Sequence, residues 1–179
     1  MHITDAKNAA KIGDFKLKSG HANKIDLDYL ASVPKSILID NAPRVYLFVV
    51  NGQIVKIGGS ASRGGIKATM TFYLAAMQGS PGRPRFVIHL LIEEALKAGK
   101  TVQLWMIVSP SVKAPIHGLT KVEYVDVASF KEMEDLCKRE YFEIESRYPD
   151  WNFQENNQPY PKKFDEMHNA YHANRLANY

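Results

Sequence analysis

The sequence contains little cysteine and lacks any long apolar segment. Its single cysteine, Cys137, excludes an internal disulfide framework and a zinc site made of several cysteines, which is typical of a protein from a reducing compartment. The longest uninterrupted apolar run, Val45 to Val50, is far too short to cross a bilayer, and the first residues lack the apolar stretch of a secretory signal. We therefore expect an intracellular, cytoplasmic protein with no membrane segment.

A strong excess of charge of one sign is also missing. The 179 residues include 23 Lys and Arg and 19 Asp and Glu, which gives a formal net charge of +4. This moderate excess permits a polyanionic partner without requiring one.

A chain of this length is the size of one domain and buries about two thirds of the surface that its unfolded form exposes. We expect residues 1–179 to form a single domain.

The clearest local pattern is a predicted β-hairpin over residues 44–58. Apolar, β-branched and aromatic residues flank Asn51-Gly52, a dipeptide typical of tight β-turns. The second strand continues into a glycine-rich loop, residues 58–65. Tyr46 and Lys56 lie within these otherwise apolar strands, where a phenol and an amine need polar partners or water. Both are therefore candidate functional residues.

Periodicity predicts further helices and strands after the hairpin. We expect helices over residues 66–78, 86–98 and 129–147, and strands over residues 102–108 and 122–127. The last helix begins with Ser129 and Glu132, the signature of a capping box. These elements predict an α/β fold of the α+β type, in which a small mixed or antiparallel three-stranded sheet is flanked by helices.

Two extensions lie outside this predicted core of residues 44–152. Residues 1–43 are polar and rich in lysine, and we interpret them as an irregular N-terminal extension with one short helix near residues 27–32. Residues 153–179 form a C-terminal arm rich in Asn, Gln, Tyr and Lys. Its side chains are able to read base edges, and the arm could equally serve in a dimer contact.

Glu140 is a candidate for a carboxylate in an unusual environment. It lies three or four residues from Leu136, Cys137 and Ile144, so the predicted helix turns it inward with its apolar stripe. A carboxylate turned inward must be paired, protonated or bound to a cation. One alternative is an internal salt bridge to a lysine such as Lys56.

Two segments resemble signature motifs of the GIY-YIG nuclease superfamily. The triplets Val45-Tyr46-Leu47 and Lys56-Ile57-Gly58 stand where the family has its two defining triplets, and residues 140–152 resemble the segment that follows the family's metal-binding glutamate. The resemblance covers roughly residues 44–157, and it is strongest to the compact type II restriction enzymes and small phage endonucleases of the family. It implies a GIY-YIG-like core that hydrolyses phosphodiester bonds of double-stranded DNA with a divalent metal.

The resemblance also implies catalytic roles. Glu140 would bind one Mg²⁺ ion, which prefers oxygen ligands and retains most of its waters. Tyr46 would accept the proton of the attacking water, and the Lys56 ammonium would lower the pKa of Tyr46 and orient that water. Because side chains alternate along a strand, Tyr46 and Lys56 share a face only if the hairpin has an odd loop or a bulge, which we expect at Gly52.

Other residues would contact the phosphate backbone. The family has an arginine after its glycine loop, and here Lys67 is the favoured replacement, with Arg63 as the rival. Tyr73 would bind the phosphate or simply pack against the hairpin. Asn152 would fix a turn near the metal or reach the DNA backbone. Three arginines in loops near the hairpin are the expected DNA contacts: Arg63, Arg83 and Arg85. The alternative is that they are ordinary solvated charges.

The resemblance favours a site-specific type II restriction enzyme that acts as a homodimer. Alternatives are a phage or mobile-element endonuclease that nicks DNA with loose specificity, and a DNA-binding module without catalysis. The glycine-rich loop is not a P-loop of a nucleoside triphosphatase, because Gly65-Ile66 stands where a P-loop needs lysine and then serine or threonine. His168 and His172 have helical metal-ligand spacing, but the sequence shows no third ligand, so we interpret them as a feature of the tail.

Overall fold

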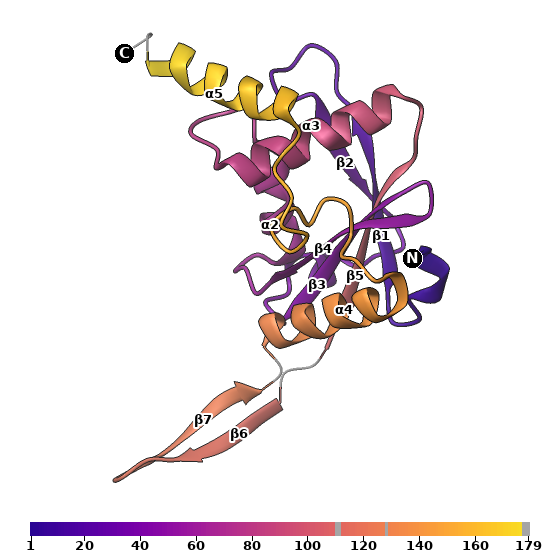
Figure 1. The fold of residues 1–179 in the computed structure, drawn as a ribbon. Coiled ribbons are helices and arrows are strands. Elements are labelled where there is room, and N and C mark those ends of the chain that lie inside the picture. The colour runs from indigo at the N-terminus through magenta and orange to yellow at the C-terminus, as the bar shows by residue number, and fades with distance from the viewer. Residues whose placement is uncertain (110–111, 128, 177–179) are drawn as a thin grey trace.

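The computed structural model describes residues 1–109, 112–127 and 129–176. Within these residues an antiparallel sheet with the strand order β2-β1-β5-β3-β4 forms the body of the molecule (Figure 1). Its strands are β1 (Ala10–Leu17), β2 (Ile25–Tyr29), β3 (Arg44–Val50), β4 (Gln53–Ser60) and β5 (Val102–Val108). This arrangement confirms the predicted α+β class.

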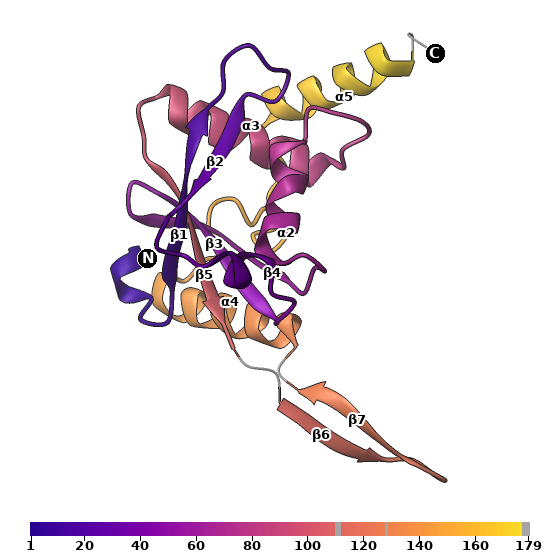
Figure 2. The same ribbon diagram turned by 180° about the vertical axis from the view of Figure 1, so that it is seen from behind.

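Helices cover both faces of the sheet. The helical segments are η1 (Ile3–Asp5), α1 (Lys35–Ile39), α2 (Gly65–Leu74), α3 (Arg83–Lys97), α4 (Phe130–Glu145) and α5 (Lys162–Leu176). Helices α2 and α3 lie on one face, α4 packs on the other face beneath β3 and β4, and α5 packs against α3 (Figures 1 and 2). None of the described helices has both the length and the apolar character that crossing a membrane requires.

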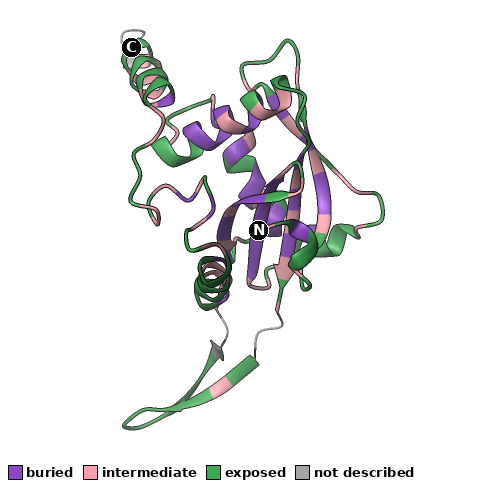
Figure 3. Cartoon of the chain, turned by 45° about the vertical axis from the view of Figure 1, so that its right-hand side comes forward, coloured by how far each residue is buried: buried purple, intermediate pink, exposed green. Residues whose placement is uncertain are grey.

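Strand β3 is buried on both faces, which explains its continuous apolar sequence. Val45, Leu47 and Val49 belong to the core under α4, whereas Tyr46 and Phe48 point into the core under α2 and α3. Alternation along β3 therefore sends its odd and even residues into two separate cores. Figure 3 shows the buried strands between partly exposed helices.

Residues 1–43 differ from the sequence-based prediction. They are not an irregular extension, because β1 pairs with β5 and β2 pairs with β1, which widens the three-stranded core to five strands. The helix expected near residues 27–32 is wrong, since β2 occupies residues 25–29. Ile25 and Leu27 alternate into the core, but the half-exposed Asp26 and exposed Asp28 next to them are of a residue type that is depleted in strands, which obscured the strand in the sequence.

The strand expected at residues 122–127 exists but belongs to a separate ribbon. Strand β6 (Val112–His117) pairs with β7 (Val122–Val127), and this ribbon projects away from the body (Figures 1 and 3). Most of its side chains that the structure describes are exposed. The ribbon leaves the body between β5 and α4.

The predicted hairpin is confirmed, with β3 and β4 as its strands. Asn51 has φ 46° and Gly52 has φ 82°, the two left-handed residues of a tight turn that matches the twist of the strands. The capping box of α4 is confirmed as well, because the Ser129 hydroxyl accepts from the Glu132 amide and the Glu132 carboxylate accepts from the Ser129 amide.

Candidate active site

A bulge in β4 brings Tyr46 and Lys56 to the same face of the sheet. Phe48 pairs with Lys56 and Val49 pairs with Ile54, which leaves Val55 as an extra residue on β4. The extra residue shifts the alternation by one, so Lys56 and Gly58 lie on the face of Phe48 and Tyr46. The expected bulge therefore exists, but at Val55 and not at Gly52.

Tyr46 forms a buried pair with Tyr73 of α2. Their hydroxyl oxygens are 2.7 Å apart, and the side chains are only 6% and 9% exposed. Burial raises the pKa of Tyr46 well above its ordinary value, and the neighbouring Tyr73 and Glu134 raise it further, whereas Arg85 acts in the opposite direction. The expectation that a nearby ammonium lowers this pKa is therefore wrong. In this state Tyr46 is a neutral phenol.

Lys56 is half-buried in the same pocket. Burial lowers the pKa of its amine; Glu155 opposes this shift, Lys138 adds to it, and Glu134 opposes it. The ammonium group of Lys56 has no hydrogen bond or ion pair with any residue in the described ranges. Its amine is thus free to contact a ligand and loses its proton more easily than an exposed lysine.

Two glycines allow close approach around the pocket. A Cβ atom at Gly58 would lie 2.8 Å from Cε2 of Tyr46, so the tyrosine ring lies directly across this glycine. At Gly59 a Cβ atom would lie 2.5 Å from Oε2 of Glu134 and 2.7 Å from the Phe130 ring. The glycines after Lys56-Ile57 therefore leave room for Tyr46 on one side and for the start of α4 on the other.

Glu134 supplies one of the two carboxylates that line this pocket. Its Oε1 lies 2.6 Å from Nζ of Lys138, one turn further along α4. Lys138 also pairs with Glu155, which follows α4 in the chain. The ammonium thus bridges two carboxylates at the edge of β4, and the Glu134, Lys138 and Glu155 side chains are 19%, 15% and 28% exposed.

Asn152 holds the segment after α4 against the edge strand β4. Its Oδ1 accepts from the Ile57 amide at 2.9 Å, and its Nδ2 donates to the Ile57 carbonyl at 3.0 Å and to Glu155 at 3.2 Å. The Trp151 amide also donates to the Val55 carbonyl at 2.8 Å. Asn152 is 2% exposed, so the structure gives it a positioning role and leaves its amide no free group for DNA.

These side chains line one pocket of about 210 Å³. Strand β4, helix α3, the start of α4 and the segment after α4 all contribute to its wall. The lining residues are Tyr46, Lys56, Gly58, Gly59, Tyr73, Pro84, Ile88, Glu134, Trp151, Asn152, Phe153, Gln154, Glu155 and Tyr160. Of the residues predicted from the sequence, the pocket therefore unites Tyr46, Lys56, Tyr73 and Asn152.

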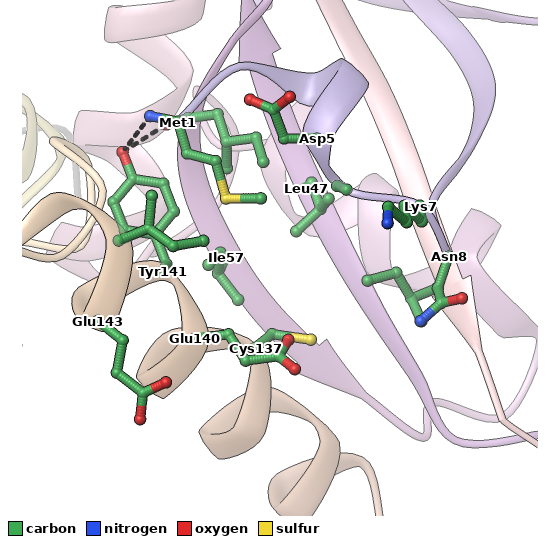
Figure 4. Close-up of a pocket in the computed structure, with 14 residues that line it drawn as sticks. Met1, Asp5, Lys7, Asn8, Leu47, Ile57, Cys137, Glu140, Tyr141 and Glu143 are labelled. Atoms are coloured by element: carbon green, nitrogen blue, oxygen red, sulfur yellow. Dashed lines mark hydrogen bonds between the residues drawn. The ribbon is translucent and has the colours of Figure 1, made fainter.

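Glu140 lies elsewhere, and this corrects the prediction from the sequence. It lines a different cavity of about 340 Å³, on the α4 side of the sheet, beside Cys137 and near Leu47 and Ile57 (Figure 4). The apolar stripe expected from the sequence is wrong in part, because Leu136 and Ile144 are 46% and 62% exposed.

The buried face of α4 instead follows Met133, Cys137 and Tyr141. At about 100° per residue, Glu134 and Glu140 each lie about 60° from the middle of this stripe, on opposite sides. The sequence reasoning therefore missed Glu134, together with Lys138 and Glu155. The i, i+4 spacing of Glu134 and Lys138 was visible in the sequence, but it is equally typical of an exposed ion pair.

The predicted cations occupy different positions. Lys67 and Arg63 are exposed at the start of α2 and just before it, and neither lines the pocket. Arg83 pairs with Asp165 of α5 at 3.1 Å. Arg85 lies over the Phe72 ring at 4.0 Å, and its charge partly opposes the rise that burial causes in the pKa of both pocket tyrosines.

The carboxylates that would hold a hard cation in this pocket are those of Glu134 and Glu155. Glu134 offers a carboxylate at a point where the glycine backbone of β4 leaves space. Among the residues that the structure describes, no group of three His, Cys, Asp or Glu side chains has metal-binding geometry. A Mg²⁺ ion that keeps most of its waters needs only one or two carboxylates, and Glu134 with Glu155 satisfies that requirement.

Comparison with solved structures finds a similar fold in a bacteriophage protein. The chain resembles a mutant of bacteriophage T4 EndoII with a TM-score of 0.52 and 16% identity, over 85% of this chain and 99% of the other. It also aligns with restriction endonuclease HPY188I in complex with product DNA, with a TM-score of 0.48 and 16% identity, over 83% and 84% of the two chains. No protein-family model matches the sequence, and no curated protein matches it.

Proposed function

We propose that this protein is a metal-dependent endonuclease of the GIY-YIG type that hydrolyses phosphodiester bonds of double-stranded DNA. The similarity of the fold to that of bacteriophage T4 EndoII supports the proposal. The observation that carries it is the Val55 bulge, which brings Lys56 beside Tyr46 in a pocket that also contains Glu134. A phenol, an amine and a carboxylate around one small pocket are suited to phosphoryl transfer.

Glu134, with Glu155 beside it, replaces Glu140 in this proposal as the metal ligand. A Mg²⁺ ion bound there would stabilise charge on the phosphate and acidify a bound water. Lys138 now neutralises both carboxylates, so metal binding requires this ammonium to move aside. Before the metal binds, the ion pairs with Lys138 explain how the pocket carries two acidic side chains without strong repulsion.

Tyr46 and Lys56 act together on the attacking water. The Tyr46 hydroxyl, held at 2.7 Å by Tyr73, orients the attacking water, and Lys56 accepts the proton of that water after its own ammonium has lost a proton to solvent, a loss that its lowered pKa favours. Arg85 replaces Lys67 as the proposed phosphate-facing cation, because its charge acts on both Tyr46 and Tyr73, although neither cation lines the pocket itself. Arginine suits this role, since its planar fork binds phosphate oxygens in pairs.

Site-specific cleavage by a cytoplasmic homodimer, as in type II restriction enzymes, is the finer form of the proposal. One active site cuts one strand, so a double-strand cut at a palindrome calls for two subunits related by a two-fold axis. A loosely specific nicking enzyme would instead give open-circular plasmid as its main product.

A DNA-binding module without catalysis is the second candidate. The ion pairs of Lys138 with Glu134 and Glu155 favour it, because they satisfy both carboxylates with no metal present. The two candidates differ in whether the protein cleaves DNA in the presence of a divalent metal or only binds it.

The test compares two neutralised glutamates on the same helix. Glu134→Gln and Glu140→Gln are incubated with supercoiled plasmid and Mg²⁺, beside the unaltered protein and an EDTA control. We expect Glu134→Gln to reduce the cleavage rate by about 10²–10³-fold or more and Glu140→Gln to stay within about threefold. Loss of activity in Glu140→Gln alone would contradict the new assignment, and intact DNA with duplex binding by all three proteins would favour the binding module.

A further inference from the structure

Helix α5 and the loop after α2 meet at two histidines. His168 and His172 lie one turn apart on α5, and their Nε2 atoms are 3.1 Å apart. The carbonyl oxygen of Pro81 lies 3.2 Å from each of these nitrogens. Three atoms that carry lone pairs therefore form a nearly equilateral triangle, which the proposed nuclease chemistry does not use.

Hydrogen bonds satisfy this triangle for only one choice of tautomers. If both Nε2 atoms carry a hydrogen, both N–H groups donate to the two lone pairs of the Pro81 carbonyl oxygen, with their nitrogens 3.1 Å apart. If one carries a hydrogen, the other nitrogen faces the carbonyl oxygen, so two acceptors meet without a donor. If neither carries a hydrogen, all three contacts join acceptors. A cation above the centre of the triangle satisfies all three lone pairs at once.

The triangle has the dimensions of a transition-metal site. With sides of 3.1–3.2 Å its corners lie about 1.8 Å from the centre, so an ion roughly 1 Å above the plane reaches the ~2.0–2.1 Å typical of zinc–nitrogen bonds. Two histidines at positions i and i+4 of one helix are a familiar pair of zinc ligands. Imidazole nitrogen also suits Zn²⁺, Co²⁺ and Ni²⁺ better than Mg²⁺.

We propose that His168, His172 and the carbonyl oxygen of Pro81 bind a transition-metal dication of the zinc class, with water completing its coordination. Both histidines are half-buried, so an ion can reach them from solvent. The backbone carbonyl is the third protein ligand that the sequence could not reveal. The ring of His168 packs edge-on against Phe86, with centroids 5.3 Å apart, which orients Nε2 toward the triangle.

The ion would fasten α5 to the loop that leads into α3. The Tyr171 hydroxyl already donates to the carbonyls of Met77 and Gly79 at 3.2 and 3.0 Å, and Arg83 pairs with Asp165. The next residues of α3 include Pro84 and Ile88, which line the candidate active site. The proposed role is structural and separate from Glu134, so it does not depend on the nuclease proposal.

Metal titration of the full chain tests this site. After removal of metal with EDTA, the protein is titrated with Zn²⁺ by calorimetry and with Co²⁺ by visible absorption. We expect one Zn²⁺ per chain, a rise of several degrees in Tm, and no competition from millimolar Mg²⁺. His168→Gln and His172→Gln should weaken Zn²⁺ binding by more than about tenfold, whereas His117→Gln, on the exposed ribbon, should bind as the unaltered protein does.

Two further variants keep the result decisive. His172→Cys retains a zinc ligand, so it should bind Co²⁺ and add a thiolate-to-cobalt absorption band even if the glutamine variants unfold. Glu134→Gln should bind Zn²⁺ normally, which separates this site from the nuclease pocket. Equal Zn²⁺ affinity in the unaltered protein and His172→Gln, or no Co²⁺ spectrum in either the unaltered protein or His172→Cys, would overturn the proposal.

Discussion

At the scale of single residues, the candidate site depends on what small side chains leave open. Tyr46 packs against Gly58, and the Glu134 carboxylate lies against Gly59. A side chain at either glycine would occupy the space that these two residues need. This gives a physical reason for the glycine that ends the second triplet. The glycine of this triplet is therefore explained by its packing against Tyr46, independently of any resemblance to a family motif.

Gly58→Ala tests this close approach. The new methyl would lie 2.8 Å from Cε2 of Tyr46, so either the ring or β4 must shift. We expect a loss of about 1–3 kcal/mol in the free energy of unfolding, measured by urea denaturation. Gly82→Ala is the control, because its nearest neighbour is 3.9 Å away and its cost as an N-cap should stay below about 1 kcal/mol. Equal effects in both variants would contradict the packing argument.

At the scale of elements, the site is held together at the edge of the sheet. Strand β4 is an edge strand, and the segment after α4 covers it through Asn152 and the Trp151 amide. An uncovered edge strand exposes unpaired backbone groups, so this cover protects β4 while it carries Glu155 to the pocket. Lys138 then links the segment back to α4.

Asn152→Ala tests this cover. The change removes the hydrogen bonds to the Ile57 amide and carbonyl and leaves those groups without a partner in a buried position. We expect a loss of about 2–4 kcal/mol in the free energy of unfolding, measured by urea denaturation. The exposed Asn8→Ala is the matched control, with an expected change within about 0.5 kcal/mol. Unchanged stability with lost DNA cleavage would instead indicate a direct catalytic role for Asn152.

At the scale of the whole molecule, the buried tyrosines link stability to alkaline pH. Burial raises the pKa of Tyr46 and Tyr73, and it raises the pKa of Tyr29 to about 12. In the unfolded chain tyrosines ionise near a pH of about 10. The unfolded state therefore loses protons first, so stability is full below that pH and falls as pH rises toward the folded pKa values.

Tyr46→Phe should reduce this alkaline loss. Each buried tyrosine contributes at most about 1.4 kcal/mol per pH unit, so the variant should show a shallower decline between pH of about 10 and 11. Urea denaturation at several pH values measures both slopes. The variant is expected to be less stable at neutral pH, because Tyr73 loses its hydrogen-bond partner, so the slopes and not the absolute values are compared. Identical slopes would contradict the burial of an un-ionised Tyr46.

The sequence by itself determined the hairpin, the α4 capping box and the α+β class. These features depend on near neighbours in the chain: Asn51-Gly52 specifies a turn, and Ser129 with Glu132 specifies a helix start. Tyr46 and Lys56 could likewise be identified as candidate functional residues from their near neighbours, because each is a polar residue in an otherwise apolar strand. Even the need for a bulge followed from alternation, although its place at Val55 did not.

Only the tertiary structure decided which glutamate joins the site. Glu134 and Glu140 lie at similar angles on either side of the buried stripe of α4, so helical periodicity treats them alike. The way α4 lies across β3 and β4 turns Glu134 toward Gly59 and Glu140 toward the other cavity. The third ligand of the histidine pair, a backbone carbonyl far away in the chain, carries no side-chain signal. Contacts between distant segments are set by packing, which local sequence patterns do not encode.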